Sequence, residues 1–288
     1  HKFDEGTLVG EMAKKLFPDG IDMPTDDFMG NINSTQTAIK NDLTIFEGGV
    51  KVGNLFSRAD ILIPNKDGWD IIEVKSSTKV KDENIYDVAF QKHCFIESGL
   101  TIRNCFLMHI NNQYVRDGSI DPNELFIKKD ITEMVDKVLT EVPTNINRLL
   151  KILTGKCPEE KKDFCCKGDP YPCPVSEFHK FLPEHHVFQL IRGGKTTKEL
   201  FESGVLDLGD IPSDYELKEK HKIQVECAKT GKTHIDKEEI KKFMDKLKEP
   251  LNYLDFETFQ TAIPLYDGVK PYQQIPFQYS LHSSDHKE

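Results

Sequence analysis

The 288-residue sequence has no apolar run that approaches the roughly 18 residues needed to span a membrane as a helix. It also has no charged-then-apolar segment of the kind that directs secretion, so we expect a cytoplasmic protein with no membrane partner. Positive charge is scarce: 38 Lys and Arg stand against 48 Asp and Glu, which gives a net charge of −10. A protein that coats nucleic acid depends on many Lys and Arg contacts to phosphate, and this balance excludes that class. An enzyme that contacts nucleic acid at one site stays open.

Cysteine is also sparse outside one segment. Four of the seven cysteines fall within residues 157–173, and the segment 157–183 carries five prolines that prevent a regular helix or strand. An odd cysteine count with such clustering favours metal binding over disulfides. We therefore predict a Cys/His metal-binding knuckle, with an unmetallated cluster as the alternative. Its predicted ligands are Cys157, Cys166, Cys173 and His179.

Apolar periodicity predicts an α/β protein that begins with a helix over 7–17 and continues with a strand meander. No internal repeat or low-complexity tract interrupts it. Further helices are predicted over 87–98, 131–139 and 146–153, and from a capping-box-like start at Asp236. The predicted strands are 44–47, 50–57, 59–63, 69–75, 101–110, 251–256 and 275–281.

The strands 59–63 and 69–75 carry three charged residues whose positions suggest a site. The turn Pro64-Asn65-Lys66-Asp67-Gly68 predicts an antiparallel hairpin in which the numbers of opposite residues sum to about 133. Asp60 and Glu73 satisfy that sum, and Lys75 lies on the same face as Glu73 because side chains alternate with period two. The hairpin therefore brings two carboxylates and an ammonium group together.

Two carboxylates facing each other are destabilising unless a cation lies between them, and oxygen ligands of this kind suit Mg²⁺ or Mn²⁺. Such an ion would polarise a phosphodiester and acidify a bound water. Lys75 would orient that water or stabilise the developing charge. The alternative is a solvated hairpin face on which Lys75 only neutralises Glu73.

Asp60 followed by Glu73-Val74-Lys75 resembles the D…ExK signature of the PD-(D/E)XK nucleases, in the RecB-like branch, and Asp87-Val88-Ala89-Phe90-Gln91 resembles the glutamine-bearing helix of that branch. The resemblance implies a restriction-endonuclease-like α/β core. It also implies that Asp60, Glu73, the Val74 carbonyl and an additional acidic ligand, Glu47, hold the catalytic metal. Lys75 would be catalytic, and Gln91 would position substrate or the lysine.

One position departs from this pattern. Enzymes of the RecB-like branch carry a metal-binding His on the first helix, where this sequence has Gly10. Either Glu11 substitutes for it or the site uses fewer ligands. The same branch includes enzymes with a four-iron cluster, so the resemblance leaves both a 4Fe-4S cluster and Zn²⁺ open for the knuckle.

A second pair of carboxylates, Asp255 and Glu257, lies on one face of the strand 251–256, which we expect to be buried. Two carboxylates on a buried strand are costly without a cation. The segment Tyr253 to Thr258 resembles the first motif of DEDD-type 3′–5′ exonucleases on an RNase H-like sheet. By that resemblance the pair forms a second metal site in a domain whose remaining ligands lie beyond this chain.

The whole chain resembles a bacterial family of uncharacterised function that joins a RecB-like nuclease domain, a Cys-rich knuckle and a DEDD-type exonuclease domain. The resemblance rests above all on the string from Pro271 to His282. We therefore expect a nuclease-like domain over 1–155, the knuckle over 156–183, a helical connector over 184–248, and the start of an exonuclease-like domain over 249–288.

These observations predict a Mg²⁺- or Mn²⁺-dependent nuclease that hydrolyses DNA, although the sequence does not distinguish DNA from RNA. The alternative is a catalytically inactive nucleic-acid-binding or adaptor module that keeps the nuclease fold and a structural metal. The sequence does not indicate the oligomeric state.

Overall fold

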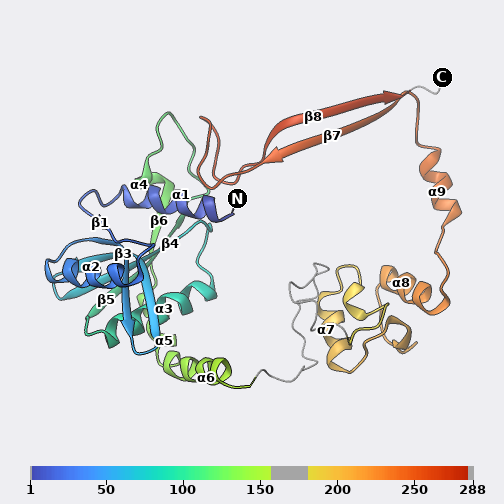
Figure 1. Ribbon diagram of the computed structural model, residues 1–288. Helices are drawn as coiled ribbons and strands as arrows, with labels where there is room; N and C mark the ends of the chain where they lie inside the picture. Colours follow the sequence, from blue (N-terminus) through green and yellow to red (C-terminus); the bar gives the residue numbers. More distant parts are fainter. Residues whose placement is uncertain (1, 157–180, 285–288) are drawn as a thin grey trace. The chain divides into compact units, whose positions relative to one another are not determined.

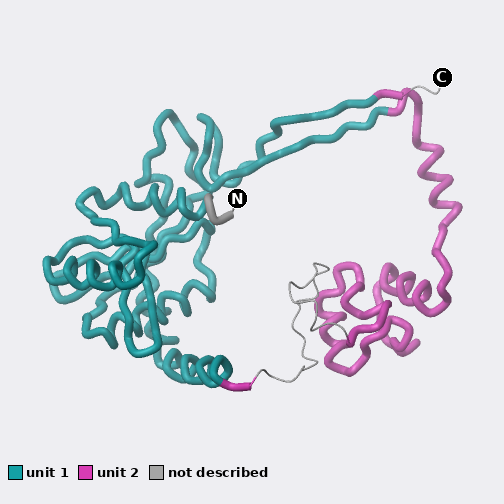
Figure 2. The backbone as a smooth tube through the Cα atoms, viewed as in Figure 1, with its two compact units in different colours: residues 1–154, 252–282 teal, residues 155–251, 283–288 magenta. Residues whose placement is uncertain are grey.

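The computed structural model describes residues 2–156 and 181–284 (Figure 1). The chain forms two compact units (Figure 2). The first comprises residues 1–154 and 252–282, and the second comprises residues 155–251 and 283–288. The first unit contains every residue of the predicted Asp, Glu and Lys site.

The first unit is built on a curled, mixed sheet of six strands, in the spatial order β1-β2-β3-β4-β5-β6 (Figure 1). The pairs β1–β2 and β4–β5 are parallel, and the other neighbours are antiparallel. The expectation of a mixed α/β protein is therefore confirmed. The strands are β1 (Ile21–Asp22), β2 (Ile45–Val52), β3 (Leu55–Asn65), β4 (Gly68–Lys75), β5 (Ile102–Ile110) and β6 (Phe126–Asp130).

Helices cover both faces of this sheet. One apolar cluster packs the sheet against α2, α3, α5 and α6, and a second packs the opposite face against α1 and α4. The helices are α1 (Lys2–Lys14), α2 (Phe28–Lys40), α3 (Asp82–Glu97), α4 (Pro122–Leu125), α5 (Thr132–Leu139) and α6 (Val142–Thr154).

Strand β4 packs against helices on both faces, so Trp69, Ile71 and Ile72 are all buried although they point to opposite sides of the sheet. Trp69 and Ile71 belong to the cluster on the α3 side, whereas Ile72 belongs to the cluster on the α1 side. Glu73 follows in the same alternation and therefore faces α3. Its side chain is only 6% exposed, so a carboxylate lies in the core of the unit.

Four features of this unit differ from the sequence prediction. Helix α2 was not predicted, and strand β6 was not predicted either. The predicted strand 50–57 is wrong because the chain turns at Gly53, whose φ of +56° suits glycine. Helix α3 begins at Asp82, five residues before the predicted start, where the Asn84 side chain accepts a hydrogen bond from the Lys81 N–H.

The second unit has its own small apolar core, contributed by residues such as Phe188, Leu200 and Val225. Asp236 caps α9 by accepting a hydrogen bond from the Glu239 N–H at 2.9 Å, as the sequence predicted. The described elements are η2 (Val187–Gln189), α7 (Gly194–Glu202), η3 (Leu208–Asp210), α8 (Glu219–Thr230) and α9 (Lys237–Met244).

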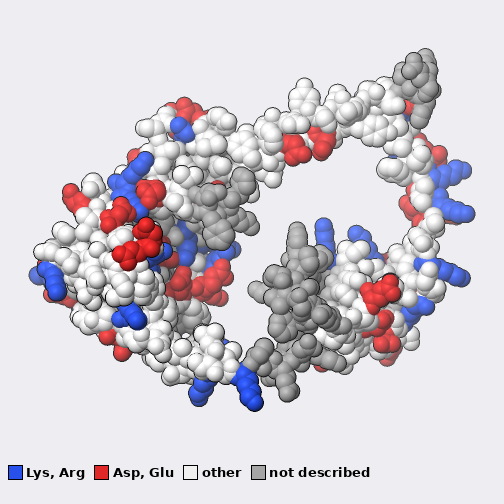
Figure 3. All heavy atoms as spheres, in the orientation of Figure 1, with Lys and Arg blue, Asp and Glu red and all other residues white. Residues whose placement is uncertain are grey.

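Strands β7 (Leu251–Phe259) and β8 (Ile275–Ser284) form a separate two-stranded sheet. Most of their side chains are exposed, and many of these are apolar. Figure 3 shows this ribbon as largely uncharged, in contrast to the mixed acidic and basic surface around the six-stranded sheet. No helix among the described residues is long and apolar enough to cross a membrane.

Candidate active site

The β3–β4 hairpin has the register that its turn predicts. Ile61 pairs with Ile72 and Leu62 pairs with Ile71, and in both pairs the residue numbers sum to 133. Gly68 closes the turn with a φ of +152°, and a Cβ atom there would lie 2.4 Å from the Thr101 carbonyl oxygen. The turn therefore demands glycine and fixes the register of the two strands.

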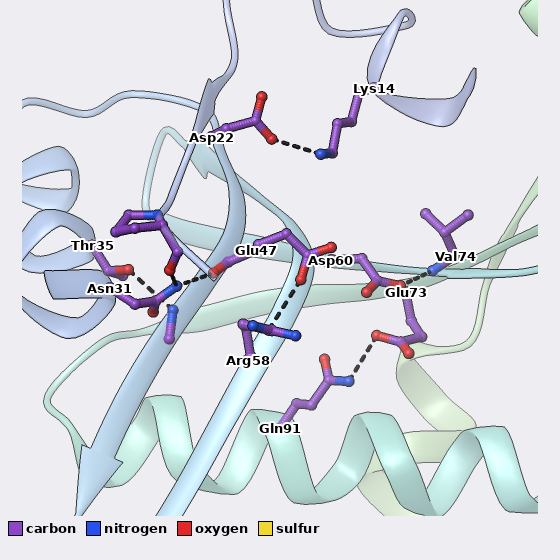
Figure 4. Close-up of polar contacts among 12 residues, drawn as sticks. Lys14, Asp22, Asn31, Thr35, Glu47, Arg58, Asp60, Glu73, Val74 and Gln91 are labelled. Carbon is purple, nitrogen blue, oxygen red and sulfur yellow. Dashed lines mark hydrogen bonds and ion pairs between the residues drawn. The ribbon is translucent and has the colours of Figure 1, made fainter. Parts of the chain in front are cut away.

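This register brings Asp60 beside the strand that carries Glu73. The Asp60 Oδ2 atom accepts a hydrogen bond from the Val74 N–H at 2.7 Å (Figure 4). Among the described residues this is the one donor to the Asp60 carboxylate. The β3–β4 pairing ends at Ile61–Ile72, and Asp60 lies beside the Glu73–Val74 segment, close enough for the charge of Glu73 to act on it.

Glu73 is held by two partners. Its Oε1 atom accepts a hydrogen bond from Lys75 Nζ at 2.6 Å. Its Oε2 atom accepts one from Gln91 Nε2 at 2.7 Å (Figure 4). Gln91 projects from α3 and is 4% exposed, and its Oε1 atom has no donor among the described residues. A buried amide oxygen in that state is available to a water or to a substrate group.

Lys75 lies between two carboxylates. Besides Glu73, its Nζ atom contacts Asp87 Oδ2 at 2.9 Å. Asp87 stands on α3, one helical turn before Gln91, so the helix brings both side chains to the end of β4. The sequence singled out Asp87 only as part of a motif, whereas the structure shows that it fixes the lysine.

The electrostatics follow from burial. Burial raises the pKa of Asp60 well above its usual value, and the charge of Glu73 raises it further. Burial likewise raises the pKa of Glu73, against the opposing effects of Lys75 and Gln91. For Lys75, burial favours the neutral amine, but the charges of Glu73 and Asp87 outweigh it and the pKa rises. The lysine is thus a positive charge fixed beside Glu73, and the pKa values of Glu73 and Asp60 are both raised.

Glu47 lies next to this group but is oriented by other contacts. Its backbone has a φ of +57°, which is uncommon for a residue with a side chain, and its carbonyl accepts a hydrogen bond from Asn31 Nδ2 at 2.9 Å. Its carboxylate pairs with Arg58 at 3.0 Å (Figure 4). Asn31 and Thr35, which bonds the Gly49 N–H at 3.0 Å, come from the unpredicted α2. Helix α2 was not predicted from the sequence. The pattern that could have indicated it is Asp27, the N-cap residue, followed at four-residue spacing by the polar residues Asn31 and Thr35.

Asp60 opens onto a pocket of about 260 Å³ between the sheet and helix α1. Gly10 and Glu11, the two positions at which the sequence left the helix-one ligand open, both line it. Glu11 is engaged by Lys14 at 2.6 Å. A Cβ atom on Gly10 would meet no heavy atom within 4 Å, so the pocket has room for a side chain there.

These contacts allow a divalent cation at Asp60 and Glu73 but do not supply a rich ligand set. Within residues 2–156 and 181–284, no three His, Cys, Asp or Glu side chains are grouped to hold a metal. Glu47 lines the same pocket as Asp60, with its carboxylate paired to Arg58. A cation held by Asp60 and Glu73 would offset both the burial and the Glu73 charge that raise the pKa of Asp60.

Two other sites were predicted from the sequence. Cys157, Cys166, Cys173 and His179 lie outside the described residues. The expectation that Asp255 and Glu257 lie on a buried strand is wrong, because both side chains are exposed on β7. Water solvates exposed carboxylates, so the pair no longer argues for a metal on energetic grounds.

Comparison with protein families matches residues 252–288 to a family described as a domain of unknown function, DUF2779. Comparison with curated proteins and with solved structures returns no match. The matched stretch covers β7, β8 and the loop between them, and this C-terminal segment is thus similar to a family whose description states no function.

Proposed function

We propose that this protein is a Mg²⁺- or Mn²⁺-dependent nuclease of the PD-(D/E)XK type that hydrolyses phosphodiester bonds in DNA, with RNA as an open second substrate. One observation carries the proposal: Lys75 and Gln91 bond the buried Glu73 carboxylate, and Asp60 from the neighbouring strand bonds the adjoining Val74 N–H. Burying a Glu with Lys and Gln partners costs more free energy than packing apolar side chains between a strand and a helix. Placement at the end of β4, where the strand leaves the core, suits a site that must admit substrate.

In this proposal Asp60, Glu73 and the Val74 carbonyl hold the cation. When bound, it lowers the pKa of a water and offsets charge on the phosphate. Lys75, fixed by Asp87 and Glu73, presents a positive charge to the negative charge that develops on the phosphate oxygens. Gln91 keeps Glu73 in place through Nε2 and offers Oε1 as an acceptor.

The test uses the full chain with labelled DNA and either Mg²⁺ or Mn²⁺. Glu73→Ala and the isosteric Glu73→Gln are expected to lose at least about 100-fold in cleavage rate, the scale of removing a preorganised electrostatic group. Glu133→Ala, an exposed acidic residue on α5, is the matched control and should cleave as the parent does. Absence of metal-dependent cleavage, or equal cleavage by the Glu73 variants, would overturn the proposal.

A second candidate is a catalytically inactive nucleic-acid-binding module with the same core. It is favoured by the pairing of both Glu73 oxygens with protein donors and by the lack of a third carboxylate or histidine ligand in the described part of the chain. The same experiment separates the two candidates, because the inactive module binds DNA without cutting it at any metal concentration.

A further inference from the structure

The loop between β7 and β8 belongs physically to the first unit. Ala262 is fully buried in the cluster between the sheet and α1, and its N–H donates a hydrogen bond to the Glu5 carboxylate. Arg116 donates hydrogen bonds to the Pro264 and Leu265 carbonyls at 3.0 and 2.8 Å. The loop is therefore docked on the sheet unit by buried and polar contacts.

The docked loop closes one side of a cavity at the end of β4. Tyr272 donates its hydroxyl hydrogen bond to the Ser76 carbonyl, and Ser76 directly follows Lys75 in the chain. The cavity has a volume of about 640 Å³. It is lined by the segment 76–81, by Asn112 and by the segment 270–273 of the loop.

The lining is unusual in its charge. It includes Lys79, Lys81 and Lys270, hydroxyl and amide side chains, and no carboxylate. Lys81 pairs with Glu83 at 3.2 Å outside the cavity. Neither Lys79 nor Lys270 has a carboxylate within 4 Å among the residues that the structure describes, and both side chains are exposed. The chain has a net charge of −10, whereas the side chains that line this cavity carry only positive charge.

Two unpaired ammonium groups with hydroxyl and amide donors are the chemistry that binds phosphate oxygens. The cavity begins at Ser76, one residue after Lys75 in the chain, so it lies at the same end of β4 as the candidate active site. We propose that the cavity is a binding site for the phosphate backbone of a nucleic acid strand, and that the β7–β8 loop supplies part of it through Lys270 and Gln273. This inference rests on the proposed function for the identity of the ligand.

The site gives the C-terminal segment a role that needs no second catalytic centre. The loop contributes Lys270, and the segment after β4 contributes Lys79, so neither part makes the site alone. The site also explains how a chain of net charge −10 would bind a polyanion, because Lys79 and Lys270 would contact the phosphates locally.

The experiment measures binding of a short, labelled single-stranded oligodeoxynucleotide by fluorescence anisotropy. The full chain is used in the Glu73→Ala background without divalent ions, so binding is observed without cleavage. Each phosphate contact adds about 0.7 to the slope of log K against log salt for a single strand. Lys79→Ala/Lys270→Ala is expected to lower that slope by about 1.4 and to weaken binding about tenfold at about 0.15 M salt.

The control is Lys66→Ala/Lys129→Ala, which removes the same charge from exposed positions on the first unit outside the cavity. It should change the slope much less. Lys270→Ala alone should lower the slope by about 0.7, and an unchanged slope would remove the loop from the site. Equal behaviour of the two double variants would overturn the inference even if the parent cleaves DNA. Conversely, a pocket-specific loss of binding in a protein that never cleaves would refute the nuclease and keep the binding site.

Discussion

Gly10 offers a gain-of-function test of the candidate metal site. It lies in α1, lines the same pocket as Asp60, and leaves its would-be Cβ atom free of contacts within 4 Å. A histidine there adds a ligand on the side where the pocket is open. One further ligand that tightens Mn²⁺ binding tenfold is worth about 1.4 kcal/mol. At saturating Mn²⁺ the same amount appears as extra stability of the folded state.

Gly10→Ala is the matched control. Without added metal, replacing a helical glycine by alanine should stabilise the protein by about 0.5 to 1 kcal/mol, and histidine should stabilise it by less. Chemical unfolding with and without Mn²⁺ then separates helix propensity from metal binding. Mn²⁺ should add about 1.4 kcal/mol more to Gly10→His than to Gly10→Ala, and calorimetry should show a Kd about tenfold lower.

A metal-dependent increment that is the same in the histidine and alanine variants would refute the reasoning. The comparison is insensitive to a metal bound elsewhere in the chain, because both variants share that contribution. It is also independent of substrate, so it tests the cation site even if cleavage is never observed.

Two further predictions test the core that holds α3. Lys92 is 5% exposed and pairs with Asp136 at 2.6 Å. Asp136→Ala should lower the free energy of unfolding in urea by about 2 kcal/mol, less than for a fully buried pair because Asp136 is half exposed. Lys92→Met should lower it by less than about 1 kcal/mol, and similar losses in both variants would contradict this. Burial raises the pKa of Cys94 to about 11 and of Cys105 to about 12, so iodoacetamide at about pH 8 should leave both unmodified while it alkylates Cys227, as peptide mapping would show. Rapid labelling of Cys94 in the native protein would mean that α3 is not packed as described.

The hairpin and its register could be predicted because turn chemistry and alternation act locally. Pro64 to Gly68 specify the turn, and period-two alternation then places the residues paired from Ile61–Ile72 to Asn65–Gly68. Before Ile61 the alternation of β3 breaks, because Ala59 and Ile61 lie in the clusters on opposite faces of the sheet. Glu73 and Asp60 could be located without knowledge of the remaining fold. Gln91 and Asp87 were reachable only through a family resemblance, because nothing local indicates that α3 crosses the end of β4.

Helix α2 could not be predicted from apolar periodicity because much of its buried face is polar. Asn31 and Thr35 are buried, and they bond the main chain of β2 instead of filling the apolar core. A search for an apolar stripe overlooks such a helix. The prediction for β7 failed in the opposite sense: its alternating aromatic and aliphatic residues correctly indicated a strand, but local pattern cannot specify whether another layer covers it.

Glu73 and Asp60 differ in the number of hydrogen bonds that their carboxylates accept, and this difference bears on function. Each oxygen of Glu73 accepts one hydrogen bond, from Lys75 or from Gln91, and such a trio alone would serve as a structural ion pair. Asp60 has only the Val74 N–H among the described residues, and it stands next to Glu73 where its charge is unfavourable. A structural role gives no reason to keep an aspartate there, because an asparagine would accept the same hydrogen bond without the repulsion. A cation shared by both carboxylates would explain why an aspartate is present. Asp60, with fewer hydrogen bonds than Glu73, is therefore the residue that favours an active site over a buried ion pair.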